Sequence, residues 1–187
     1  MTKRDRFIIS TTILASLLWA PSLFAADKGS QFGIVWGLSV PDADNTNVFH
    51  VFGVKGASFF NPQFSLGGYF FVSDKAGQIS SSDQFNYSLT GVETAYHMPA
   101  TAGDTFLAFR MGVTKLQTSP NQTSVIVSPY HYGVAVGYDY YWNGTLSLGF
   151  EGSYMHCLPG RTTITGTEYD IPSFNIISFL VSIQVRL

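Results

Sequence analysis

From Ser30 to Leu187 the sequence alternates between large apolar residues and small or polar residues, and clusters of turn residues interrupt the alternation. A period of two residues is typical of β-strands whose two faces meet different surroundings. Most of the alternating segments are long enough to cross a bilayer as a tilted strand, which takes about 9–11 residues. The pattern predicts strands at about 30–40, 47–60, 63–73, 84–97, 104–117, 124–142, 145–157 and 172–187.

The division between the two faces is clearest in the segment 172–187. Its large apolar side chains share one face, which carries Ile177, Phe179, Val181, Ile183, Val185 and Leu187. The opposite face carries Ser178, Ser182, Gln184 and Arg186. The segments 124–142 and 145–157 divide in the same way, with large apolar residues and tyrosines opposite small, polar or charged ones.

This division separates two kinds of closed sheet. A soluble barrel of the lipocalin kind would hold its large apolar side chains inside and present polar ones to water. Here the polar face consists mainly of glycine, alanine and serine with isolated charges, which is a poor lining for an apolar ligand. It fits the narrow lumen of a membrane barrel whose apolar face meets lipid. We therefore expect an all-β fold over residues 26–187, an eight-stranded antiparallel up-and-down transmembrane β-barrel.

The links between these strands alternate in length. The longer links are Asp42–Asn45, Asp74–Asp83, Ser119–Gln122 and Pro159–Asp170, and the shorter ones are Asn61–Pro62, Met98–Gly103 and Asn143–Gly144. Because outer-membrane barrels have long outer loops and short periplasmic turns, we expect both termini in the periplasm. At the last turn we expect a three-residue link from Asn143 to Thr145. This link pairs Tyr140 with Leu148, so that the apolar faces match.

Two strands depart from the simple pattern. In the segment 84–97, Tyr87 and Leu89 share a parity with Glu93, whereas Val92 and Tyr96 take the other. A bulge near Gly91 would shift the register once and return the apolar residues to the lipid face. In the segment 47–60, His50 joins Phe52 and Val54 on the lipid face, near the outer rim.

The first 25 residues have the pattern of a secretory signal peptide. A basic start with Lys3, Arg4 and Arg6 precedes the apolar stretch Phe7–Trp19, and small residues end the segment at Ala25. The alternative is an uncleaved anchor, but the apolar run is short for a span of about 20 residues. After Ala25 acidic residues outnumber basic ones, so no nucleic-acid partner is expected.

Four stretches carry a resemblance to known proteins: FSLGGYFF, LSLGFEGSYMH, HYGVAVGYDYYW and the C-terminal SFNIISFLVSIQVRL. With them the chain from Gln31 to Leu187 resembles the small eight-stranded outer-membrane β-barrel family, which includes OmpX and the membrane domain of OmpA. The resemblance implies a monomer in the outer membrane of a Gram-negative bacterium. Its partners would be outer-membrane lipid, lipopolysaccharide and the barrel-assembly machinery. Members usually end in Phe, whereas this chain ends in Leu187, a position of the sorting signal that the machinery recognises.

The charges expected on the lumen face are balanced. They are Lys55, Arg110 and Arg186 against Glu93, Asp139 and Glu151. Since unpaired charges are costly in a low-dielectric interior, the balance predicts an internal hydrogen-bonded plug. We expect Glu93 to face Arg110 across two neighbouring strands, with Lys55 and Glu151 as the other possible partners. Passage of protons or ions is the alternative.

An enzyme that modifies lipid A is a further alternative. A hydrolase of that kind needs a serine activated by a histidine that a carboxylate orients, and the nearest set is His131, Ser153 and Glu151. The expected register places His131 opposite Cys157, away from the level of the serine. The lipid A deacylases carry a His-x-Ser element, which does not occur here. The histidines have no metal-ligand spacing, so we predict no catalytic, cofactor-binding or metal-binding residue; they are His50, His97, His131 and His156.

The function expected from these features is structural or surface-interacting and non-enzymatic. The alternative is transport of small molecules, apolar ones included, across the outer membrane, and a further alternative is lipid A modification. The loops form a mildly acidic rim that suits cations, basic partners or simple solvation, and its members are Asp42, Asp44, Asp74, Asp83, Glu168 and Asp170.

Overall fold

The computed structural model describes residues 29–42, 48–74, 77–80, 83–118, 125–127, 129–164 and 167–187. The predicted signal peptide, residues 1–25, lies outside them. The strands are β1 Ser30–Asp42, β2 Phe49–Asn61, β3 Phe64–Ser73, β4 Gly77–Ser80, β5 Asp83–Ala100, β6 Gly103–Thr118, β7 Val125–Val127, β8 Tyr130–Tyr141, β9 Leu146–Cys157, β10 Gly160–Ile164, β11 Thr167–Ile171 and β12 Phe174–Arg186. Within these ranges, no helix has the length and apolar character needed to cross a membrane.

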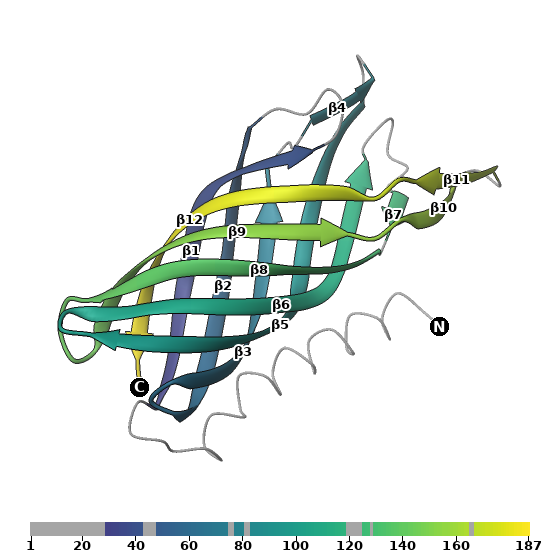
Figure 1. The fold of residues 1–187 in the computed structure, drawn as a ribbon. Coiled ribbons are helices and arrows are strands. Elements are labelled where there is room, and N and C mark those ends of the chain that lie inside the picture. The colour runs from purple at the N-terminus through teal and green to yellow at the C-terminus, as the bar shows by residue number, and fades with distance from the viewer. Residues whose placement is uncertain are drawn as a thin grey trace, which may run out of the picture.

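The long strands close into one antiparallel barrel (Figure 1). The order around the wall is β5-β3-β2-β1-β12-β9-β8-β6, and β6 pairs with β5 to complete the ring. Each long strand pairs with the next long strand along the chain, and β1 closes on β12 from the pair Gln31–Arg186 to the pair Asp42–Asn175. The predicted eight-stranded antiparallel barrel is therefore confirmed.

The two ends of the barrel differ. At one end, here called the turn end, short links join β2 to β3, β5 to β6 and β8 to β9, and the backbone of Ser30 pairs with that of Leu187. At the other, the loop end, the hairpin of β10 and β11 projects beyond the barrel (Figure 1). The three-residue turn is confirmed, because Tyr140 pairs with Leu148. The side chain of Asn143 stabilises it by accepting hydrogen bonds from the amides of Thr145 and Leu146, at 2.8 and 2.7 Å.

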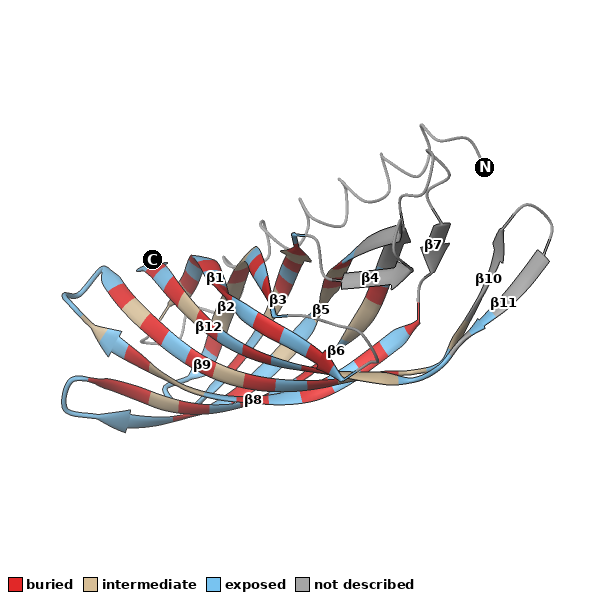
Figure 2. Ribbon diagram, turned by 90° about the horizontal axis from the view of Figure 1, so that it is seen from above, coloured by how far each residue is buried: buried red, intermediate tan, exposed pale blue. Residues whose placement is uncertain are grey.

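Buried and exposed residues alternate along the barrel strands (Figure 2). On β12, Phe179 is 67% exposed on the outside, whereas its neighbour Ser178 is 5% exposed inside. The same alternation on β8 and β9 turns Val136 and Phe150 outward and Ala135 inward, as predicted. The continuous apolar outside is the reverse of a soluble barrel, and it is the arrangement that a hydrocarbon surrounding requires.

The predicted bulge near Gly91 is wrong. β5 pairs with β3 and with β6 through Gly91 without a register shift. Tyr87 and Leu89 therefore keep the parity of Glu93 and lie buried inside the barrel. Their surroundings explain this: the ring of Phe49 meets Tyr87 edge-on at 5.0 Å, so the loop-end half of the lumen is lined by apolar groups that these side chains pack against.

The predicted sixth strand, 124–142, is two strands, β7 and β8. Pro129 lies between them; it has no amide hydrogen to donate to a neighbouring strand, and its carbonyl accepts a hydrogen bond from the amide of Thr114 at 2.8 Å. Two of the predicted long links contain strands as well. β4 pairs with the extended part of β5, and β10 pairs with β11.

Candidate functional site: the interior of the barrel

Four charged side chains at mid-height of the barrel form the plug: Lys55 of β2, Glu93 of β5, Arg110 of β6 and Glu151 of β9. Arg110 faces Glu93 in register, as predicted. Its Nε donates to Glu93 Oε2 at 2.5 Å, and its Nη2 also contacts that oxygen. Its Nη1 and Nη2 donate to the two carboxylate oxygens of Glu151 at 2.5 and 2.8 Å. Lys55 Nζ donates to Glu151 Oε2 at 3.2 Å. Glu151 therefore links the two cations.

The plug crosses the lumen. β8 lies between β6 and β9, while β1 and β12 lie between β2 and β9, so the ion pairs join strands that are not neighbours in the wall. Arg110 has 0% exposure, and its fork on Glu151 is the bidentate geometry that makes charge-assisted hydrogen bonds strong. Aromatic faces complete its surroundings, since the guanidinium lies 5.2 Å from the ring centroid of Tyr69 and 5.4 Å from that of Phe71.

The other two predicted lumen charges have different partners. Asp139 is buried and accepts a hydrogen bond from Gln184 Nε2 at 2.7 Å. Gly149 makes room for this pair, because a Cβ there would lie 2.6 Å from the Asp139 carboxylate. Arg186 is half-buried and stacks on the ring of Tyr141 at 4.1 Å. The predicted set omitted Asp104, a buried carboxylate on β6 that accepts a hydrogen bond from the Tyr141 hydroxyl. Its lumen parity with Arg110 was the signal that would have found it.

His131 is held by hydroxyl groups. Its Nε2 lies 2.5 Å from the Tyr69 hydroxyl, and its Nδ1 lies 2.9 Å from the Thr114 hydroxyl. It pairs across the wall with Cys157, as predicted, whereas Ser153 pairs with Ala135. Both ring nitrogens are thus engaged away from Ser153. The geometry does not bring His131, Ser153 and Glu151 together as a nucleophile with its base.

The remaining histidines lie apart from one another. His50 stacks on Trp36 with 6.0 Å between the ring centroids, on the lipid face as predicted. His97 hydrogen-bonds Ser65 inside the turn end at 2.9 Å, and His156 hydrogen-bonds Asn175 near the loop end at 2.7 Å. Over the part of the chain that the structure describes, no group of three or more histidine, cysteine or acidic residues is arranged to hold a metal ion.

Above the plug, toward the loop end, the interior contains a cluster of buried apolar residues beside hydroxyl groups such as those of Ser39 and Ser178. Its buried residues, called the apolar cluster below, are Val35, Phe49, Val51, Tyr69, Phe71, Tyr87, Leu89, Met155, Cys157, Ile176 and Leu180. The sequence analysis missed this cluster because it described the lumen from the small and polar inward residues of β8, β9 and β12 and left out Met155, Ile176 and Leu180, which also point inward. The inward parity of Val51 with Lys55 was the signal that would have found it.

No protein-family model matches this sequence, and none of the curated proteins is similar to it. Solved structures are similar in fold. Neisserial surface protein A has a TM-score of 0.67 at 9% identity, with 84% of this chain and 97% of that chain covered. OprG, an outer membrane protein of Pseudomonas aeruginosa, has a TM-score of 0.60 at 10% identity, with 86% and 97% covered. Ail, the attachment invasion locus protein of Yersinia pestis, has a TM-score of 0.54 at 13% identity, with 84% and 97% covered. The chain therefore has the fold of the small outer-membrane barrels.

Proposed function

We propose that this protein is a non-enzymatic outer-membrane barrel with a structural or surface-interaction role and a lumen closed to ions. The observation that carries the proposal is the plug, in which Glu151 binds both Arg110 and Lys55 across the interior. Buried ions held in this way are expensive to separate, because each would be left in a low-dielectric interior without its partner. The closed lumen leaves the outer surface and the loops as the parts that meet other molecules.

The outer surface of the barrel indicates what surrounds the protein, because its outward-facing apolar side chains form a belt around the wall. Its apolar belt requires hydrocarbon, so we expect outer-membrane lipid and lipopolysaccharide as the main partners, insertion by the barrel-assembly machinery, and a monomer. In Gram-negative cells the turn end, with both termini, would lie in the periplasm. The described acidic residues at the loop end include Asp42, Asp74 and Asp170, which favour cations or basic partners over polyanions at the cell surface.

Ion conductance and lipid composition test this proposal directly. In a planar bilayer the purified barrel should add no steady conductance to that of the lipid, and cells with and without the protein should have the same lipid A. If lipid A loses an acyl chain only in cells that contain the protein, the proposal is wrong and the protein is an enzyme. A large, steady conductance in the planar bilayer would show that the protein is an open pore. Protease access to a tag at the C-terminus, in intact and in opened cells, tests the orientation.

Passage of small apolar molecules is a second candidate function, and one observation favours it. The apolar cluster occupies the loop-end half of the lumen, so an apolar solute entering from that end would meet Phe49 and Leu89 rather than charges. The wall between β9 and β12 offers no exit, because their pairing runs without a shift from Cys157–Phe174 to Leu146–Val185. Uptake of an apolar fluorophore by proteoliposomes, measured against liposomes without protein, separates this function from the first.

A further inference from the structure

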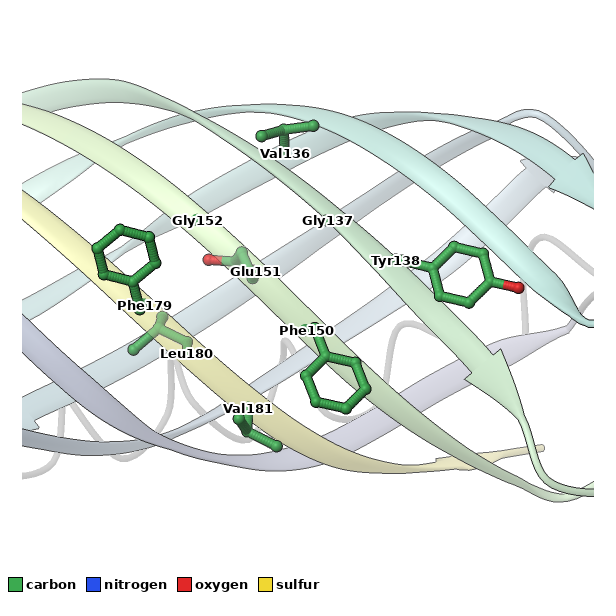
Figure 3. A pocket seen from close by; sticks show the side chains of 9 residues that line it. All are labelled: Val136, Gly137, Tyr138, Phe150, Glu151, Gly152, Phe179, Leu180 and Val181. Carbon is green, nitrogen blue, oxygen red and sulfur yellow. The ribbon is translucent and has the colours of Figure 1, made fainter.

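The strands β8, β9 and β12 carry different side chains on their two faces. Their outer face has a hollow lined mostly by apolar groups, and Figure 3 shows Phe150, Phe179 and Val181 around it. The inner face of the same strands carries a group of polar side chains between the plug and the turn end, called the inner polar cluster below. Its members are Asp139 of β8, Ser147 of β9, and Ser182 and Gln184 of β12, each with at most 4% exposure.

Strand pairing brings these four side chains together. Gly149 of β9 pairs with Asp139 on one side and with Ser182 on the other. Two residues along, Ser147 pairs directly with Gln184. A Cβ at the glycine would lie 2.3 Å from Ser182 Oγ, 2.6 Å from Asp139 Oδ1 and 2.8 Å from Gln184 Nε2. The three polar groups therefore converge over Gly149, whose missing side chain leaves them the space.

Two oxygen atoms of the cluster, Ser147 Oγ and Gln184 Oε1, have no hydrogen-bond partner among the described residues. They belong to residues directly opposite each other on neighbouring strands, where Cβ atoms lie about 4.5–5.5 Å apart. Ser147 has 2% exposure and Gln184 has 0%, so bulk water does not reach either side chain. Because buried polar atoms in folded proteins nearly always have a partner, two unpartnered oxygens on paired residues indicate a bound group between them.

Among the described residues, Asp139 has no ion-pair partner of its own. Its carboxylate accepts a hydrogen bond from Gln184 Nε2 at 2.7 Å, and the ion pairs of the lumen join other residues. Lys55 acts on Asp139 electrostatically, but Lys55 Nζ donates to Glu151 at 3.2 Å. A carboxylate buried with only a neutral donor is costly, so a positive charge at this place would stabilise the cluster.

The amide of Gln184 connects this negative charge to the unpartnered oxygens. Its nitrogen donates to Asp139 Oδ1 at 2.7 Å and to Ser182 Oγ at 2.9 Å, so its Oε1 lies on the other side of the amide. Hydrogen bonds polarise one another in a low-dielectric interior. Donation to the carboxylate therefore makes Oε1 more negative and a stronger ligand for a cation.

We propose that the inner polar cluster binds one monovalent hard cation such as sodium, which enters from the turn end and stops at the plug. Ser147 Oγ and Gln184 Oε1 supply ligand oxygens, Asp139 supplies the compensating charge, and water completes the coordination. Oxygen atoms of these kinds are the ligands that hard cations prefer. A single carboxylate matches a single positive charge, and the nearby Lys55 repels a divalent ion more strongly than a monovalent one.

A water molecule is the alternative occupant. It can donate hydrogen bonds to both unpartnered oxygens, but it carries no charge and leaves Asp139 uncompensated. The two occupants differ in one measurable respect. A cation that binds only the folded barrel makes its stability depend on which salt is present at constant ionic strength, whereas a water molecule does not.

Stability in two salts tests the site. The folded barrel in lipid vesicles is titrated with urea in sodium chloride and in choline chloride of equal concentration, since choline is too large to enter the cluster. The wild type should unfold at a higher urea concentration in sodium chloride. Ser147→Ala removes an oxygen that has no described partner within the protein, so loss of an internal hydrogen bond cannot explain its effect. This variant should lose most of the difference between the salts and bind sodium roughly tenfold more weakly by sodium-23 NMR.

Ser153→Ala is the matched control, because Ser153 is also an inward serine of β9 but lies outside the cluster. It should keep the response of the wild type to sodium. Asp139→Asn removes the charge with little change of shape and should also abolish the response, which provides a second variant if Ser147→Ala does not fold. Folding is followed separately by the shift in gel migration on heating.

Two results would overturn the site. An equal urea midpoint of the wild type in both salts would leave water as the occupant. A full sodium response in folded Ser147→Ala or Asp139→Asn would show that sodium acts elsewhere on the barrel. Neither result bears on the closed lumen, whereas a steady sodium conductance of the wild type in a planar bilayer would reject the proposed function.

Discussion

Two regions of the barrel interior, the plug at mid-height and the apolar cluster toward the loop end, use opposite kinds of side chain. At mid-height, Arg110 and Lys55 meet two carboxylates through directional contacts, and each charge depends on its partners. Toward the loop end, residues such as Leu89 and Ile176 fill the lumen through non-directional apolar packing. A missing group should therefore have different consequences: loss of a partner leaves a buried charge in the plug, but leaves only a cavity in the apolar cluster.

The largest effect is expected for Arg110→Met. It leaves the Glu93 carboxylate without its ion-pair partner and removes both hydrogen bonds of the fork on Glu151. Breaking a buried pair on one side costs about 3–5 kcal/mol, so the free energy of unfolding should fall by that amount. Urea titration in lipid vesicles measures it. Lys115→Met removes an exposed cation from the same strand and should change stability little. An equal, small loss in both variants would show that the plug is not a stabilising network.

A double-mutant cycle sharpens the result for the plug. Glu93→Gln should destabilise the barrel less than Arg110→Met does, because Arg110 keeps Glu151 as a partner. In the double variant, part of the loss should be recovered, since no buried charge of the original pair remains. Residues in one ion-pair network typically couple by about 0.5–3 kcal/mol. Strictly additive losses in the same urea titrations would mean that Glu93 and Arg110 do not interact.

In the apolar cluster, Leu89→Ala should cost about 2–3 kcal/mol, from lost apolar burial and the cavity left behind. The matched control is Leu107→Ala, which truncates a lipid-facing leucine on the next strand and should cost less, because lipid chains can occupy the vacated space. The conductance of Leu89→Ala should remain that of the wild type, because the plug is unchanged. A greater loss for Leu107 than for Leu89 would contradict the inward position of Leu89, which replaces the predicted bulge.

The contrast between the two regions also explains what the sequence could predict. On β8, β9 and β12 the outward residues are mostly large and apolar and many inward ones are Gly, Ala or Ser, so size and parity together identify the faces correctly, although Ile176 and Leu180 point inward. On β5 the same rule fails, because Tyr87 and Leu89 are large and nevertheless point inward. The pair of Glu93 with Arg110 followed from the position of one turn. The two hydrogen bonds from Arg110 to Glu151 could not be predicted in this way. Contacts across the lumen between strands that are not neighbours depend on how the barrel closes, and they leave no pattern in the local sequence.

The smallest effect is expected where the two regions meet. Tyr69 belongs to the apolar cluster, stacks near the Arg110 guanidinium and shares a hydrogen bond with His131. Tyr69→Phe keeps the ring, and with it the packing and the cation–π contact, and removes only the hydroxyl. The expected loss is about 1 kcal/mol, the typical net contribution of one hydrogen bond. Tyr132→Phe, on the lipid face, is the control and should change nothing. In Tyr69→Phe the His131 ring keeps Thr114 as a partner, so the barrel should still fold and remain closed to ions. A loss as large as that of Arg110→Met would mean that the hydroxyl, rather than the ring, connects the plug to the apolar cluster.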